Sequence, residues 1–430
     1  MTDTTAPSAA TGGLPPGIPL EAPAESRVNP VGRDPGAFTL NESMSVSLDG
    51  IRALASQAVV VGHTISFFGV LPQLQPPSAP YMQNIGVVVF FVLSGYLISY
   101  TVWRKRAKGP YTFRTYAIER FARIFSGFLP GLALIVALDA VVILHDSSRY
   151  AYAGQYSVSS LVANLAMVQD HDFATFVSRF VPGIVKPWIA GVTTFGSGRP
   201  LWTLAIEWWI YMAFGWFVLA GASRSRHPVR YLGTAVLVAA LPLFNLVGGR
   251  GNSLTLMWIM GALAFWLSLT LPPRWSVRTS LAMALLLTLA AAYRVFLTKQ
   301  EYDLVFACLL AGALFFMLST FRMSSFRYPT PISRAAKLFA GYSLTLYLIH
   351  YTILAAMVAV DLPLPKPLLV VSAICLCNVV AALIAWPTEM QHKRFAAWLL
   401  ARIPGPVAPE PVDHRSQLAP APLEQQRPEP

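Results

Sequence analysis

The chain is built from long apolar runs that are separated by short polar connections. Roughly ten of these runs reach the ~20 residues that a helix needs to cross a bilayer. The pattern predicts an all-α fold, a polytopic membrane helix bundle with about ten transmembrane helices. No internal repeat relates two halves of the chain, as one would in many transporters. The expected spans lie near residues 51–70, 84–103, 124–144, 200–221, 231–248, 254–271, 279–297, 302–320, 338–360 and 367–387.

Composition agrees with a membrane protein. The 430 residues are 55% hydrophobic and 12% charged, whereas a soluble domain carries roughly 25% charged residues. The net charge of +12 would suit a nucleic-acid binder, but the cations cluster in the short connections between apolar runs. That placement is what the positive-inside rule expects, so nucleic acid is not a predicted partner. The three cysteines lie inside apolar runs and predict no disulfide framework.

The two ends of the chain differ from its middle. Residues 1–44 are rich in Pro, Ala, Gly and Thr and contain no apolar run of signal-peptide length. We expect a disordered cytoplasmic leader there, and a Pro-rich disordered tail over residues 403–430. Residues 45–390 then form the membrane domain, in which residues 145–199 make a long extracytoplasmic segment.

Loop charges give the orientation. The connection 104–123 holds seven Lys and Arg residues against Glu119 alone, whereas the connection 71–83 holds no cation. Because cations mark the cytoplasmic loops, both termini should lie in the cytoplasm and the segment 145–199 outside. The expected location is a bacterial inner membrane, crossed many times.

Three ionisable residues lie deep inside expected spans. Arg52 begins the first span, and His63 follows eleven residues later, which places it about 16 Å deeper and past the midplane. Glu207 lies about 10 Å below the outer face, and His350 about 15 Å from the outer end of its span. If these helices face one another, His63, Glu207 and His350 form one polar chamber. Ionisable groups at such depth are costly and mark functional sites.

The chamber would suit acyl transfer. A neutral imidazole can accept a proton from a hydroxyl group and return it later, so His63 is the candidate base. We expect Glu207 to orient or stabilise His63, and His350 to position the acceptor or assist proton transfer. The alternative for each histidine is a hydrogen bond between helices that serves packing alone. Arg52 would be an interfacial anchor in that case, with Asp49 three residues earlier as its partner.

The basic connection 104–123 also allows two interpretations. It could set the topology and contact anionic lipid. It could instead form a phosphate-binding mouth for a nucleotide-bearing donor such as coenzyme A, with Arg106, Arg120 and Arg123 as ligands. We find no Gly-rich phosphate loop, no His-Glu-x-x-His site and no Gly-x-Ser-x-Gly elbow. No metal and no permanently bound cofactor are therefore predicted, and Gly95 in the run VLSGY more simply permits close helix packing.

Several runs together resemble the membrane-bound acyltransferase-3 family, from about residue 46 to 387. They are LDGIRALASQAVVVGH, GVVVFFVLSGYLIS, RFARIF, PLWTLAIEWWIYM and SLTLYLIHY, in that order. The resemblance implies O-acylation, usually O-acetylation, of sugars in cell-surface polysaccharides, lipopolysaccharide or small glycosides. It implies a cytoplasmic acyl-CoA donor, a carbohydrate acceptor, contact with membrane lipid and a place among polysaccharide-assembly proteins. It also implies that Arg52 and His63 are needed for activity.

The chain departs from the family in its fourth span. Related sequences often have Glu and Gln after the glutamate that Glu207 matches, and here Trp208 and Trp209 take those places. A second carboxylate is therefore not essential in this chain.

Three functions follow as hypotheses. In the first, the thioester of acyl-CoA reaches His63, which acts as general base on an acceptor hydroxyl or becomes transiently acylated. In the second, the protein is a proton-coupled transporter or flippase of a lipid-linked glycan, because buried His and Glu residues also serve proton relays. A membrane scaffold without chemistry is the third, and it leaves the buried ionisable residues unexplained.

Overall fold

The computed structural model describes residues 38–403, except 149, 170, 185, 187, 188, 190, 191, 248–253 and 272–274. Most of the expected leader and nearly all of the expected tail lie outside the described residues. Within them the chain is helical and contains no strand. The first long helix begins at Glu42, inside the range expected to be disordered.

Each of the ten expected spans contains a long helix, which confirms the fold class. The long helices are α1 (Glu42–Phe68), α2 (Met82–Ala107), α3 (Phe113–Asp146), α7 (Leu201–Leu219), α9 (Pro228–Val247), α10 (Leu254–Thr270), α11 (Val277–Thr298), α12 (Leu304–Met323), α14 (Ser343–Val360) and α15 (Lys366–Ala385). In the described part of the chain, nine helical segments are long and apolar enough to cross a membrane, and α10 is a shorter apolar helix of 17 residues. The protein is thus a multi-pass membrane protein.

Shorter helices lie between and after the spans. They are α4 (Val158–Leu165), α5 (His171–Ser178), α8 (Gly221–Arg226), α13 (Thr330–Gly341) and α16 (His392–Arg402), with 3-10 turns at Pro72–Leu74, Ala153–Gln155 and Glu389–Gln391. The expected span 338–360 is in fact two elements, because the chain turns at Tyr342 between α13 and α14.

Local sequence explains where several helices begin. The Asn41 side chain accepts a hydrogen bond from the backbone N–H of Met44 at 2.8 Å and so caps α1. Ser276 and Asp303 cap α11 and α12 in the same way. These side chains satisfy backbone N–H groups that have no partner inside the helix, which fixes the register in which each span enters the bundle.

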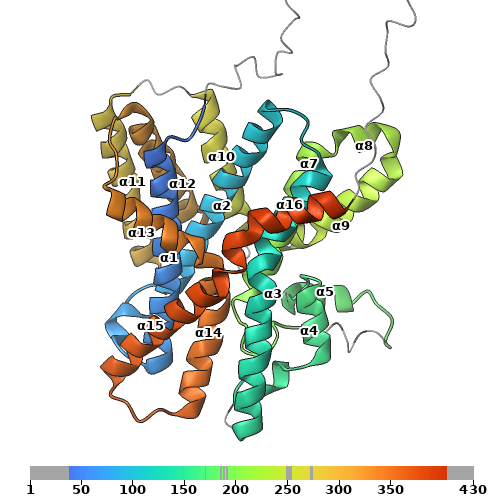
Figure 1. Cartoon of the computed structure of the whole chain (residues 1–430), viewed down its shortest axis with the longest axis vertical. Helices are drawn as coiled ribbons and strands as arrows, with labels where there is room; N and C mark the ends of the chain where they lie inside the picture. The colour runs from blue at the N-terminus through green and yellow to red at the C-terminus, as the bar shows by residue number, and fades with distance from the viewer. Residues whose placement is uncertain are drawn as a thin grey trace, which may run out of the picture. The chain divides into compact units, whose positions relative to one another are not determined.

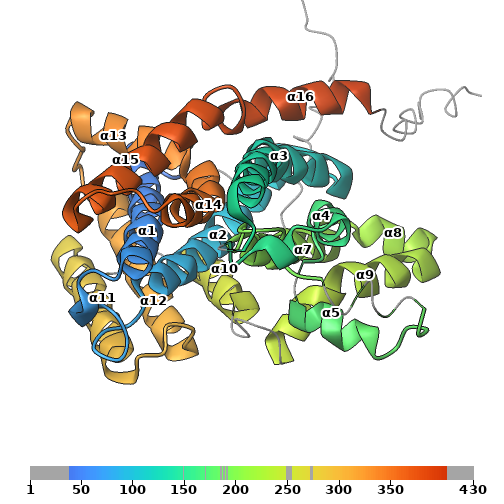
Figure 2. The same ribbon diagram turned by 90° about the horizontal axis from the view of Figure 1, so that it is seen from below.

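The centre of the bundle is formed by α1, α2, α3 and α14. Helix α1 packs against α2, α14 and α15, and α3 packs against α14 and α16. Figures 1 and 2 both show α14 beside α3, with α16 lying across α3. The contact between α2 and α10 is especially close, because a Cβ atom at Gly95 would lie 1.9 Å from the carbonyl oxygen of Trp258. Gly95 therefore has the packing role that its sequence context predicts.

The segment 145–199, which the sequence predicts to be extracytoplasmic, is attached to the bundle through a buried carboxylate. Asp139 of α3 accepts hydrogen bonds from the Tyr150 hydroxyl, and from the N–H and hydroxyl groups of Ser197 at 2.8 and 2.7 Å. The Ser197 hydroxyl is also 2.7 Å from Thr352 of α14. Asp139 is fully buried, and it connects both ends of the segment to the two central helices.

Candidate active site

Two histidines meet at the contact of α1 with α14. Nδ1 of His63 lies 3.0 Å from Nε2 of His350, and the ring centroids are 5.0 Å apart. The His350 side chain is buried, and that of His63 is partly buried. The structure therefore brings together two of the three residues that were placed at one depth from the sequence.

The hydrogen-bond partners of the ring nitrogens define which nitrogen of each imidazole carries the hydrogen. Nδ1 of His350 lies 3.1 Å from the carbonyl oxygen of Leu346, so this nitrogen carries the hydrogen and Nε2 is an acceptor. Nδ1 of His63 faces two acceptors, this Nε2 and the carbonyl oxygen of Val59 at 3.1 Å, and must therefore donate. A neutral His63 then carries its free lone pair on Nε2, the nitrogen that a general base would use.

Aromatic side chains lie beside His63 on the side of the segment 145–199. The Tyr351 ring is edge-on to His63 with centroids 5.2 Å apart, and it also contacts Phe67 at 4.8 Å. The Tyr152 hydroxyl lies 2.9 Å from the Tyr351 hydroxyl. Burial raises the pKa of Tyr152 above its ordinary value, so the phenol stays protonated.

A cavity of about 280 Å³ lies among α1, α2, α3, α7 and α14. One end of the cavity includes Arg120, Arg123 and His392, and the other end includes Thr203 and Tyr347. The Tyr347 hydroxyl is 2.6 Å from that of Thr203, and the Tyr347 ring centroid lies 6.1 Å from that of His350. Tyr347 thus belongs to the cavity wall and neighbours His350 on α14, whereas the described lining of the cavity includes neither His63 nor His350.

Arg52 and Glu207 line the same cavity. Arg52 lies 3.9 Å from Asp49 in an ion pair whose side chains are about a quarter exposed, 27% and 26%. Glu207 accepts a hydrogen bond from Tyr211, whose hydroxyl is also 2.6 Å from Ser94. The cavity therefore contains guanidinium groups together with a carboxylate that is held by neutral donors.

A family model described as an acyltransferase domain, acyltransferase-3, matches residues 45–386, a segment that includes both His63 and His350. The chain belongs to the acyltransferase-3 family. A curated relative, "Protein 2 in picA locus" from Rhizobium radiobacter, is 33% identical over 92 residues, which are 21% of this chain and 44% of the relative. The chain thus spans less than half the length of that relative. The comparison with solved structures found no match.

Within this acyltransferase-3 chain the predicted role of Glu207 beside His63 is wrong. In the described part of the chain, the hydrogen bond of Glu207 goes to Tyr211, and the side-chain partner of His63 is His350. Residues 207 and 211 are one turn apart on α7, so they share the face that lines the cavity. Equal depth in the membrane did not imply that the side chains face each other.

The three arginines that were predicted to bind the donor do not all lie at the same place in the structure. Arg120 and Arg123 line the cavity, and Nε of Arg120 is buried without a hydrogen-bond partner among the described residues. Arg106 is exposed in the last turn of α2 and lies 3.5 Å from the carbonyl oxygen of Val218, near the end of α7. The cavity lining within the described residues does not include Arg106, so the structure does not place it with the other two.

Sequence reasoning missed Tyr347, His392 and Glu389. Glu389 is fully buried and forms an ion pair with Arg123, with Oε1 and Nη1 2.8 Å apart. It lies three residues beyond the matched acyltransferase-3 segment. The sequence does contain one signal that could have pointed to Glu389, since it is the only acidic residue between Asp361 and Glu410.

Proposed function

We propose that the protein is a membrane-bound O-acyltransferase. It moves an acyl group from cytoplasmic acyl-CoA to a sugar hydroxyl. The acyl group is acetyl, because O-acetylation is the usual reaction of the family. The acceptor is a cell-surface polysaccharide, oligosaccharide or glycolipid. The observation that carries the proposal is the His63–His350 pair, because its hydrogen bonds leave Nε2 of His63 as a free base inside a family of acyltransferases.

The cavity supports a donor that carries phosphate groups. Arg52, Arg120 and Arg123 present guanidinium groups to one space, and guanidinium groups bind phosphate through paired charge-assisted hydrogen bonds. The pantetheine arm of coenzyme A would run from these arginines towards Tyr347. Because Tyr347 lies at that end of the cavity and its ring neighbours that of His350, a thioester there would come within one side chain of the histidine pair.

The chemistry then follows from the ring nitrogens. Nε2 of His63 takes the proton of the acceptor hydroxyl while the hydroxyl oxygen attacks the thioester carbonyl carbon. The new C–O bond forms, the C–S bond breaks, and the thiolate of coenzyme A receives the proton from the His63 imidazolium. His350 accepts the hydrogen bond from Nδ1 of His63 throughout, and so stabilises the positive charge while it exists.

The acceptor would approach from the extracytoplasmic side. Phe67, Tyr152 and Tyr351 form an aromatic cluster beside His63, and amphipathic rings of this kind suit a ligand with both apolar faces and hydroxyl groups. The donor would thus be cytoplasmic and the acceptor external, in a bacterial inner membrane with both termini in the cytoplasm. Loop charges support that orientation. Polysaccharide-assembly proteins are the partners that this location suggests.

The test uses the purified protein in lipid nanodiscs with acetyl-CoA and a mixture of simple glycosides. We expect release of free coenzyme A that depends on the glycoside, together with an acetylated glycoside in the mass spectrum. In His63→Ala this release should stop while the protein still inserts into membranes. Full turnover by His63→Ala would refute the mechanism. A wild-type protein that moves a lipid-linked glycan and releases no coenzyme A would instead support the transporter hypothesis.

A further inference from the structure

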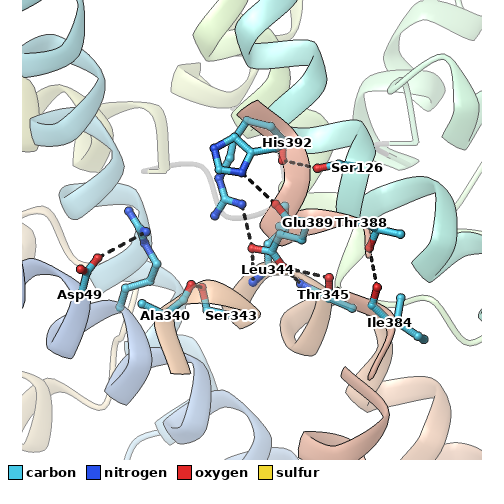
Figure 3. Close-up of polar contacts among 12 residues, drawn as sticks. Asp49, Ser126, Ala340, Ser343, Leu344, Thr345, Ile384, Thr388, Glu389 and His392 are labelled. Carbon is cyan, nitrogen blue, oxygen red and sulfur yellow. Dashed lines mark hydrogen bonds and ion pairs between the residues drawn. The ribbon is translucent and has the colours of Figure 1, made fainter. Parts of the chain in front are cut away.

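Glu389 connects three parts of the cavity wall. It begins the 3-10 turn Glu389–Gln391, between α15 and α16 (Figure 3). Oε1 accepts a hydrogen bond from Nη1 of Arg123 at 2.8 Å and from the N–H of Leu344 at 3.4 Å. Oε2 accepts from the N–H and the hydroxyl of Thr345, both at 2.8 Å. Both carboxylate oxygens are therefore engaged, and they join α3 to the start of α14.

Helix α14 needs this carboxylate at its first turn. Its N-cap residue, Tyr342, provides no side-chain hydrogen bond to the helix. The first backbone N–H groups of a helix have no partner within it, and a negative charge is favourable there because of the helix dipole. Glu389, which comes from a distant part of the chain, supplies both the acceptor for these N–H groups and the negative charge. It thereby fixes the start of the helix that carries Tyr347 and His350.

Arg123 benefits from the same carboxylate. Its guanidinium has five N–H donors, and the bond to Glu389 uses Nη1. Arg123 also lines the cavity next to Arg120. An arginine that is already held in one conformation loses less freedom when a phosphate binds, so the complex gains affinity through preorganisation.

We propose that Glu389 is a positioning residue for the donor, and that it acts through Arg123. It holds the Arg123 guanidinium at the cavity wall and fixes α14 against it. The inference rests on the proposed acyl-CoA donor, and it concerns a residue outside the segment that the family model matches.

The test is a double-mutant cycle on donor binding. The dissociation constant of coenzyme A is measured for the wild-type protein in nanodiscs, and for Glu389→Gln, Arg123→Gln and the double variant. Ordering one flexible side chain on binding costs a free energy that corresponds to a few-fold loss of affinity. We therefore expect Glu389→Gln to weaken the binding of coenzyme A about three- to tenfold. The KM for acetyl-CoA should rise by more than kcat falls. The double variant should bind no more weakly than Arg123→Gln, because Glu389 acts through that side chain.

Glu119→Gln is the matched control. Glu119 lies on α3 near Arg123 and pairs with Lys105 and Tyr111, but it is not among the described residues that line the cavity. Its replacement should leave the dissociation constant unchanged. Glu389→Asp is the second variant, used if Glu389→Gln does not fold. It keeps the charge but is one methylene shorter, so its affinity should fall between those of wild type and Arg123→Gln.

Three results would overturn the positioning role. They are wild-type affinity in Glu389→Gln, wild-type affinity in Glu389→Asp, and losses that multiply in the double variant. Failure of the wild-type protein itself to bind coenzyme A would refute the proposed function. Because the wild-type measurement comes first, these two failures are distinguishable.

Discussion

His350→Ala is the substitution that most directly tests the histidine pair. It removes the acceptor that lies 3.0 Å from Nδ1 of His63. The carbonyl oxygen of Val59, 3.1 Å from the same nitrogen, remains in place. The tautomer of His63 should therefore survive the substitution. What is lost is the hydrogen bond that stabilises His63 when it carries the acceptor's proton.

That difference sets the expected magnitude. A hydrogen bond to a charged group contributes about 1.5–3 kcal/mol, and each 1.36 kcal/mol changes a rate about tenfold. We therefore expect His350→Ala to lower kcat about 10- to 150-fold. Removal of the general base itself costs about 10²- to 10⁴-fold, so His63→Ala should be the more damaging variant of the two.

The assay is the release of free coenzyme A from acetyl-CoA by the protein in nanodiscs, with the glycoside that the wild-type protein acylates. Cys377→Ala is the control for packing, because the buried Cys377 thiol lies 3.8 Å from the backbone carbonyl of His350. It removes a small buried side chain beside His350 and leaves both imidazole rings intact. Its kcat should stay close to that of wild type.

Two outcomes would refute this reasoning. If His350→Ala keeps the wild-type kcat, the hydrogen bond to His63 has no part in the reaction. If its loss equals or exceeds that of His63→Ala, His350 is itself the base, and the assignment of the ring nitrogens is reversed.

Three further predictions concern other parts of the chain. Arg52→Gln should raise the KM for acetyl-CoA about 10- to 100-fold through the loss of a charged phosphate contact, and an unchanged KM would place the donor elsewhere. Asn378→Leu should lower the unfolding free energy in detergent by about 1 kcal/mol, since it breaks the paired amide bonds with Gln57 at 2.7 and 3.1 Å; an unchanged melting temperature would contradict this. The bond from Arg294 lowers the pKa of Asp303 below 3.8, so Asp303→Asn should cost at most about 1 kcal/mol at neutral pH. This stability difference should shrink as the pH falls below 3.8 and vanish below the lowered pKa, and thermal melts at several pH values would check it.

The spans and the role of Gly95 in close helix packing could be predicted because they depend on local sequence, although the sequence did not name α10 as the partner helix. Length and hydropathy decide which segments can cross a bilayer, and a glycine such as Gly95 allows two backbones to come close. The ion pair of Arg52 with Asp49 was accessible for the same reason, since a helix places residues three apart on one face.

The site was predicted less completely because it depends on which way each helix face points. A rise of ~1.5 Å per residue gives depth along the membrane normal, but rotation about the helix axis is set by packing. His63 and His350 share a depth and face each other. Glu207 was assigned a similar depth, yet it faces the cavity. Glu389 could not be placed at all, because its partners are more than 40 residues away.

The division of the span 338–360 was hidden for a related reason. Helix α13 carries apolar residues along one face, and a sliding hydropathy window merges it with α14. The break at Tyr342 leaves backbone N–H groups of the first turn of α14 without a partner inside the helix, and Glu389 accepts hydrogen bonds from two of them. Neither feature changes the mean hydropathy of the region.

A pair of neutral histidines suits this depth better than a histidine with a carboxylate. An ionised carboxylate away from water is costly unless a cation or several donors hold it. Two buried carboxylates in this bundle obey that rule, since Glu389 pairs with Arg123 and Asp139 accepts three hydrogen bonds. His63 and His350 together bury no net charge while the protein waits for substrate. In the proposed mechanism, charge arises only when His63 takes the acceptor's proton, and the same burial then favours rapid transfer of that proton to the departing thiolate.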